Sequence, residues 1–169
     1  MIMAMGGLLK MIRKVLVICL LSVLLLSSFA GAAEKGVPKP GPRDKCPVCG
    51  MFVAKYPDWT MAVRFKDGSH VFFDGAKDMF KYLFDMKKYD PARKPEDVQA
   101  VLVKDYYCLS FMDARQAWFV LGSDVYGPMG RELIPLEKES DAREFMNDHK
   151  GKKLLRYSGV TREVIKTLD

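Results

Sequence analysis

The chain has 169 residues, 28% charged and 49% hydrophobic, with a formal net charge of +6 at pH 7. The first 33 residues hold three basic residues and no acidic residue, so the net charge of the remainder is only +3. The remainder has no basic stripe interleaved with aromatic residues, which argues against a nucleic-acid partner. Its length is enough for one compact domain or for two small units that share an interface.

Residues 1–33 have the pattern of a secretory signal peptide. Basic residues precede an apolar run over residues 15–26, and small residues follow that run up to Ala33. Because the run is too short to span a membrane, we expect cleavage near Ala33, a periplasmic protein and no transmembrane segment in the mature chain. The alternative is an uncleaved anchor over residues 15–26. Cys19 lies inside the apolar run, which argues against a lipid anchor.

Residues 34–45 form a proline-rich linker. Prolines 38, 40 and 42 alternate with glycine and charged residues. Repeated proline removes backbone hydrogen-bond donors, so the linker is expected to be extended and solvated, without helix or sheet.

The next six residues, Cys46-Pro47-Val48-Cys49-Gly50-Met51, bring together two thiols and a thioether. Thiolate and thioether donors select copper(I), whereas zinc takes the thiols and ignores the thioether. Gly50 permits a tight backbone turn that lets Cys49 and Met51 face one point. The spacing alone leaves three alternatives open, which are a strained disulfide, half of a structural zinc site and a redox-active pair.

Three cysteines follow residue 33, namely Cys46, Cys49 and Cys108. An odd number leaves at least one thiol unpaired, which argues against a simple disulfide scaffold. Cys46 either ligates a metal or protects Cys49 as a disulfide. Cys108 lies in an apolar run at the end of a predicted strand, a position typical of a packed thiol.

The pattern after the sulfur cluster predicts a first ββαβ unit, which with that cluster spans residues 46–112. Its expected elements are strands over 59–65, 70–73 and 98–105 and a helix over about 76–87. Asp67-Gly68 supplies the hairpin turn between the first two strands. Asp74 is placed to cap the helix, whose apolar residues recur on one side.

The same order of elements recurs over residues 113–169. Strands are expected over 117–121, 131–136 and 154–158, with a loop over 122–130, a helix over 140–149 and a short closing helix over 161–168. The recurrence indicates a tandem repeat with a period of about fifty residues. Neither unit buries enough apolar surface alone, so we predict an α+β fold in which the two ββαβ units pack together and leave a cleft between their loops.

Met129 lies in the segment Gly127-Pro128-Met129-Gly130, between two predicted strands. Methionine usually fills gaps in a core, but the flanking residues suit a turn, so Met129 is a candidate ligand from the second unit. His70 opens a strand and His149 ends a helix. Neither has a partner at a metal-binding spacing such as HxxxH, so both are expected to be structural.

Five short motifs occur in a fixed order between about residues 46 and 158. They are Cys49-Gly50-Met51, Phe73-Asp74-Gly75, Asp113-Ala114-Arg115, Gly122-Ser123 and Gly127-Pro128-Met129-Gly130. Together they resemble the NosL family, the accessory proteins of nitrous oxide reductase. The resemblance implies a fold of two similar ββαβ units and an exported copper(I) chaperone that supplies copper for the copper-sulfide centre of that enzyme. The implied partners are nitrous oxide reductase and its maturation ABC-transporter complex.

The chain also departs from the family pattern. Many members carry a lipid-attachment cysteine just after the signal, and this chain has none in a suitable place. Many have a single cysteine before Gly-Met and a histidine a few residues later, whereas this chain has a second thiol, Cys46, and no such histidine. The candidate copper ligands are therefore Cys49, Met51 and Met129, with Cys46 in the place of the histidine.

Other functions require features that this sequence lacks. A thioredoxin-like oxidoreductase needs CxxC at the start of a helix, and a zinc ribbon needs a second pair of ligands. A lyase that cleaves carbon–mercury bonds needs a carboxylate beside the thiols, and nothing in the sequence places one there. We expect a metallochaperone and no enzyme. The alternative is a periplasmic CxxC thiol oxidoreductase or a general metal-sequestering protein.

Overall fold

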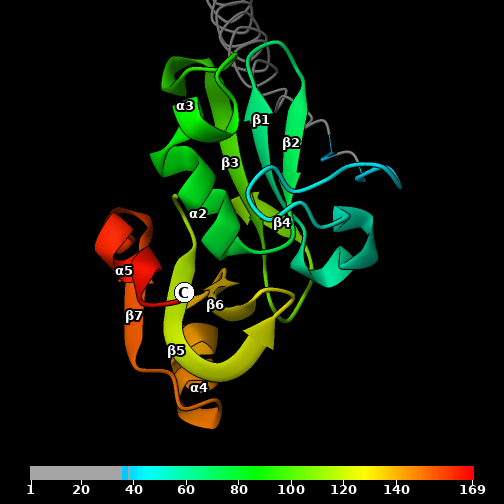
Figure 1. Cartoon of the computed structure of the whole chain (residues 1–169). Helices are drawn as coiled ribbons and strands as arrows, with labels where there is room; N and C mark the ends of the chain where they lie inside the picture. Colours follow the sequence, from blue (N-terminus) through cyan, green and yellow to red (C-terminus); the bar gives the residue numbers. More distant parts are fainter. Residues whose placement is uncertain (1–35, 38) are drawn as a thin grey trace, which may run out of the picture. The chain divides into compact units, whose positions relative to one another are not determined.

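The computed structural model describes residues 36–37 and 39–169, so the predicted signal peptide lies outside the described residues. The described chain contains two antiparallel sheets (Figure 1). One has four strands in the order β2-β1-β3-β4, and the other has three strands in the order β6-β5-β7. Within this part of the chain, no helix combines the length and the hydropathy that a bilayer crossing requires.

Each sheet contains one ββαβ unit, and the first sheet has an additional edge strand, β4. The first comprises β1 Met61–Phe65, β2 His70–Phe73, α2 Ala76–Phe84, α3 Met86–Tyr89, β3 Val98–Lys104 and β4 Phe111–Asp113. The second comprises β5 Trp118–Gly127, β6 Gly130–Leu136, α4 Glu139–Asp148 and β7 Lys153–Arg156, followed by the short helix α5 Arg162–Lys166. In both, the first strand lies between the second and third. The predicted α+β fold of two ββαβ units with a short C-terminal helix is therefore confirmed.

Helix α2 joins the two units. It contacts β1 and β2 of its own unit and also β6 and α5 of the second (Figure 1). Phe80 on α2 packs edge-on against Phe119 on β5, with ring centroids 5.4 Å apart. Because α2 has apolar neighbours on both sides, one continuous core includes residues from both units.

Helix α4 covers the other face of the second sheet. Successive side chains of β5 point to opposite faces, as expected for a strand. Phe119 and Leu121 therefore join the main core, whereas Val120 joins a smaller cluster with Phe145 of α4. The second unit thus packs one sheet face on α2 and the other on its own helix.

The expected loop over residues 122–130 is wrong. Strand β5 continues to Gly127, so that only Pro128 and Met129 connect it to β6. The pairing of β5 with β6 shifts between Leu121 and Tyr126, and Gly122 there has φ +78°, a left-handed conformation that favours glycine. Gly122 therefore marks a bulge within a long strand and not the start of a loop.

The expected helix over residues 76–87 is interrupted. Helix α2 ends at Phe84, and α3 begins at Met86. Asp85 between them has φ −143° and ψ 56°, which lie outside the helical region. Strand β4, which has only three residues, was not predicted.

Candidate metal centre

The sulfur cluster lies in a small closed loop. Lys45 and Phe52 form a β-bridge at its base, and the backbone N–H of Cys46 donates to the carbonyl of Met51 at 2.9 Å. Gly50 has φ +77°, so the tight turn uses the left-handed conformation that glycine tolerates best. The loop leaves Cys46 1% exposed and Cys49 half-buried.

Two carboxylates face the two thiols. Ligand atoms of Cys46, Cys49, Asp74 and Asp78 all lie within 4.8 Å of one another. The Cys49 thiol donates to Asp74 Oδ1 at 3.2 Å, and the Cys46 thiol donates to Asp78 Oδ2 at 3.6 Å. All four residues are buried or half-buried, so the structure forms a compact group that could hold one metal ion.

The expectation that no carboxylate lies beside the thiols is wrong. Asp74 follows β2 directly, and Asp78 lies in the first turn of α2. Asp74 precedes the N-cap residue Gly75, so the two carboxylates come together where the chain passes from β2 into α2. The sequence shows two aspartates at this junction, but it does not indicate that the junction faces the sulfur loop.

The predicted capping role of Asp74 is also wrong. The N-cap residue of α2 is Gly75, which offers no side chain. The buried carboxyl group of Glu132, on β6 of the second unit, instead accepts a hydrogen bond from the backbone N–H of Lys77 in the first turn. A Cβ atom at Gly75 would lie 2.1 Å from Glu132 Oε2, so a side chain there would displace this cap. With the cap supplied by Glu132, Asp74 is free to face Cys49.

A cavity of about 790 Å³ lies beside the thiol–carboxylate group. Cys49 and Asp78 line it from the first unit, and Met129 lines it from the β5–β6 turn of the second. The buried Lys77 ammonium donates to the carbonyl of Met129 at 2.8 Å and to that of Leu168 at 3.3 Å. Lys77 therefore holds the Met129 turn and the C-terminal segment at this cavity.

The two candidate methionine ligands differ in position. Met129 is 42% exposed and shares the cavity with Cys49. Met51 is half-buried, and it does not belong to the described residues that line this cavity. A ligand role for either sulfur stays a prediction, with the shared cavity in favour of Met129.

Burial raises the pKa of the Cys46 thiol to about 12. It also raises the pKa of Cys49, and hydrogen bonds to Asp74 and Asp78 add to the effect. Both thiols are therefore protonated near neutral pH, and a metal ion that binds them must displace protons. A thioredoxin-like oxidoreductase requires the opposite shift, because the thiolate is its nucleophile.

The remaining cysteine and the histidines lie outside the group. Cys108 is exposed, with its sulfur 2.9 Å from Ser110 Oγ, so the expectation of a packed thiol is wrong. Within residues 36–37 and 39–169, all three cysteines are free thiols. His149 lies near Asp124, at 3.4 Å between Nδ1 and Oδ1, and His70 stacks beside Phe72.

Comparison with known proteins places the chain in a family. A family model for NosL matches residues 38–165. The crystal structure of the copper chaperone NosL from Shewanella denitrificans is 27% identical, with a TM-score of 0.63 over 76% of this chain and 98% of that one. The solution NMR structure of the apo-NosL protein from Achromobacter cycloclastes is 19% identical, with a TM-score of 0.45 over 62% of this chain and 87% of that one. A search of curated proteins gave no match. Since the family model spans most of its length, this chain belongs to the NosL family.

Proposed function

We propose that this protein is a copper(I) metallochaperone that holds one ion on Cys46 and Cys49 and releases it to a partner. The observation that supports the proposal is the pair of thiols beside a cavity that also contains Met129. Thiolate and thioether donors are the set that copper(I) prefers. The ion would lie where the two units meet.

The carboxylates suit the chemistry of loading. Both thiols must lose a proton when the metal binds. Asp74 accepts a hydrogen bond from Cys49 at 3.2 Å and is placed to take that proton. The carboxylates are hard donors and copper(I) is a soft ion, so their role is to receive protons and to attract the cation.

The positions of the thiols suit release by ligand exchange. Cys46 is buried, whereas Cys49 is half-buried and lines the cavity. A thiolate of the partner enters through the cavity, binds the ion on the side of Cys49 and Met129, and then replaces Cys46. The protein catalyses no reaction of its own in this scheme.

The proposed recipient is nitrous oxide reductase, with its maturation ABC-transporter complex, and the proposed location is the periplasm. Membership of the NosL family supports the partners. The basic, apolar and small-residue pattern of residues 1–33 supports export and cleavage.

Titration of the reduced protein with copper(I) against a chromogenic chelator tests the proposal. We expect about one equivalent of copper(I), retained strongly in the presence of zinc, because a thioether adds affinity only for the softer ion. Equal or better retention of zinc would refute the copper assignment, since two thiols and two carboxylates also suit tetrahedral zinc.

A second candidate function is cleavage of carbon–mercury bonds, which the carboxylate beside Cys49 favours. In that reaction both thiols bind the mercury of R–Hg–X. The Cys49 proton passes through Asp74 to the carbon and leaves as RH, and the Cys46 proton leaves as HX. Incubation with phenylmercury acetate distinguishes the two functions. Release of benzene that Asp74→Asn abolishes would indicate the lyase, and mercury capture without benzene would leave the chaperone.

A further inference from the structure

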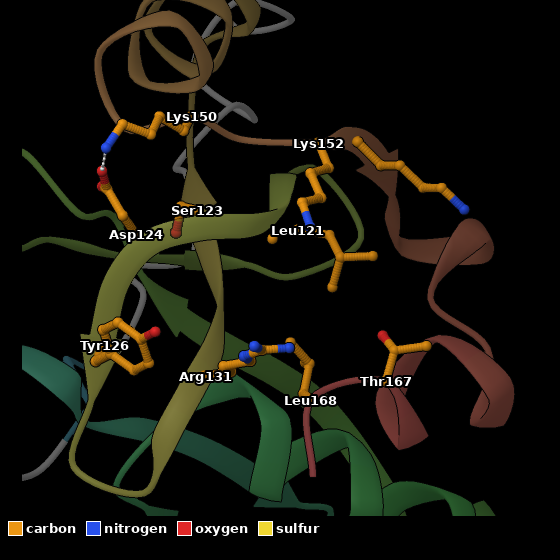
Figure 2. Close-up of a pocket in the computed structure, with 11 residues that line it drawn as sticks. Leu121, Ser123, Asp124, Tyr126, Arg131, Lys150, Lys152, Thr167 and Leu168 are labelled. Atoms are coloured by element: carbon orange, nitrogen blue, oxygen red, sulfur yellow. Dashed lines mark ion pairs between the residues drawn. The ribbon is translucent and has the colours of Figure 1, made fainter.

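A second cavity, of about 470 Å³, lies on the second unit next to the metal centre (Figure 2). It is lined by Arg131 from β6, by Lys152 just before β7 and Lys153 at its start, and by Ser123 and Tyr126 from β5. Figure 2 shows Arg131 and Lys152 facing the same hollow, with Tyr126 at its edge. We call this hollow the basic cavity.

The basic cavity carries unbalanced positive charge. Among the described residues that line it, Asp124 is the only one with a carboxylate, and it already pairs with Lys150 at 3.2 Å. Across the part of the chain that the structure describes, Arg131, Lys152 and Lys153 form no ion pair. Three cations without partners around one hollow attract negatively charged groups and raise their local concentration.

The local backbone fixes part of this arrangement. The N–H of Lys152 donates to the carbonyl of Leu121 at 2.8 Å. Gly122 lacks a Cβ atom, which would lie 3.0 Å from the Lys152 side chain, so the aliphatic stem of the lysine can pack there. Ser123 Oγ is buried and has no hydrogen-bond partner among the described residues. The Gly122-Ser123 motif therefore lines and shapes a polar cavity. Neither residue belongs to the thiol–carboxylate group or lines the metal cavity.

The basic cavity and the metal cavity share a wall. Arg131 and Leu168 line both of them. A molecule bound in the basic cavity would therefore lie directly beside the opening through which Cys49 and Met129 are reached.

We infer that the basic cavity docks an acidic segment of the protein that receives the metal. The inference rests on the proposed chaperone function, because docking here would hold the recipient's thiols at the metal cavity. The cations come from β6 and the start of β7 and surround an open hollow, an arrangement that suits several carboxylates along an extended chain. Complementary charge of this kind mainly accelerates association and fixes orientation.

Copper transfer to short synthetic peptides tests this inference. Each acceptor contains Cys-Ala-Ala-Cys, followed by either four glutamates or four serines. Copper(I) leaves two cysteines of the protein for two of the peptide, and the peptide's thiol protons pass to the protein. We expect transfer to the glutamate peptide to be at least about fivefold faster at low ionic strength, because the acidic tail steers docking.

Lys152→Glu/Lys153→Glu is the test variant. Lys66→Glu/Lys87→Glu is its matched control, since Lys66 and Lys87 are exposed and lie outside both cavities. Both double variants change the net charge equally. The test variant should lose the advantage of the acidic tail, whereas the control should keep it. An equal loss in the two variants, or no loss in either, would overturn the inference.

Fluorescence anisotropy of a labelled hexaglutamate peptide on the metal-free protein separates this inference from the proposed function. If the wild type fails to retain copper(I), the chaperone proposal fails. The docking site is then decided only by whether hexaglutamate binding depends on Lys152 and Lys153. Displacement of the peptide by millimolar phosphate, but not by chloride at equal ionic strength, would indicate a small-anion site and overturn the inference. Binding to phosphatidylglycerol vesicles that requires these lysines, without peptide binding, would also overturn it.

Discussion

The two ββαβ units share one strand order but differ in what surrounds their helices. Helix α2 of the first unit contacts both units, and six of its nine residues are buried. Helix α4 of the second unit packs on β5, β6 and β7 of its own unit, and only Ala142 and Phe145 of its ten residues are buried. Asp74 and Asp78, the carboxylates beside the thiols, lie just before α2 and in its first turn. The first turn of α4 also carries acidic residues, Glu139 and Asp141, but they do not belong to the thiol–carboxylate group found among the described residues.

This difference shows how a repeated fold acquires one site. The start of α2 is covered by the second unit, which supplies both the cap from Glu132 and the turn that carries Met129. The start of α4 has no side-chain cap. The metal centre thus depends on the contact between units, and variants on the two sides of that contact can test the dependence.

The largest expected effect is that of Cys49→Ser on copper affinity. Loss of the thiolate that lines the cavity should weaken copper(I) binding at least about a hundredfold, which corresponds to about 2.7 kcal/mol. Cys108→Ser is the matched control, because Cys108 is an exposed thiol outside the group. Competition titration of the two variants measures both effects, and a larger loss in Cys108→Ser would move the site to Cys108.

Gly75→Ala should destabilise the fold by about 1–3 kcal/mol. The added methyl group would meet the Glu132 carboxyl, which is buried and hydrogen-bonded to Lys77 and Leu133 and so cannot move aside freely. Gly41→Ala is the control, since a Cβ there meets its nearest atom at an ordinary 3.5 Å. Urea unfolding measures both variants. An unchanged midpoint for Gly75→Ala would show that the contact between units tolerates the change.

Glu132 should make stability depend on pH. Burial raises the pKa of this carboxyl from 4.5 to about 8. Between these values the folded protein holds a proton that the unfolded chain releases, so stability should fall as pH rises, by up to about 1.4 kcal/mol per pH unit.

The Glu132→Gln variant keeps an acceptor for the Lys77 N–H but removes the titrating group, so the slope should disappear. Glu137→Gln is the control, because Glu137 is an exposed glutamate close to Glu132 in the sequence. This variant should keep the slope of stability against pH. Urea midpoints measured between about pH 5 and about pH 8 decide the outcome. A slope that persists in Glu132→Gln would assign the pH dependence to another group.

The smallest expected effect is that of Met129→Leu. A thioether ligand predicts a drop of about tenfold in copper(I) affinity, or about 1.4 kcal/mol, and the loss of one sulfur scatterer in X-ray absorption. The melting temperature of the metal-free protein should barely change, because leucine preserves volume and apolar character. Met112→Leu on β4, which lies outside the metal cavity, is the control. Unchanged affinity in Met129→Leu would confine the site to the first unit.

The sequence predicted the parts of the molecule that local chemistry determines. Alternating strands, amphipathic helices and their repetition indicated the two ββαβ units, because each pattern is contained within one element. Cys46 and Cys49 were recognisable as a pair for the same reason. Pro128 and Met129 were correctly predicted to lie between two strands. The bulge at Gly122 hid the full length of β5 from the sequence pattern.

The remaining features depend on packing between elements far apart in the chain. The sequence shows Asp74 before a helix, where a capping role is the usual expectation. Only the fold shows that Glu132 occupies that role and that Asp74 faces Cys49. A glutamate inside an apolar strand carries no local sign of the helix that it caps.

The cap from Glu132 also has a consequence for the order in which the protein is made. Fifty-five residues separate Lys77 from Glu132. At a synthesis rate of about 5–20 residues per second, roughly 3 to 11 s pass between the two. During that interval both thiols exist, but the cap of α2 and the turn that bears Met129 do not. The nascent chain therefore holds two adjacent thiols before the second unit can complete the site around them.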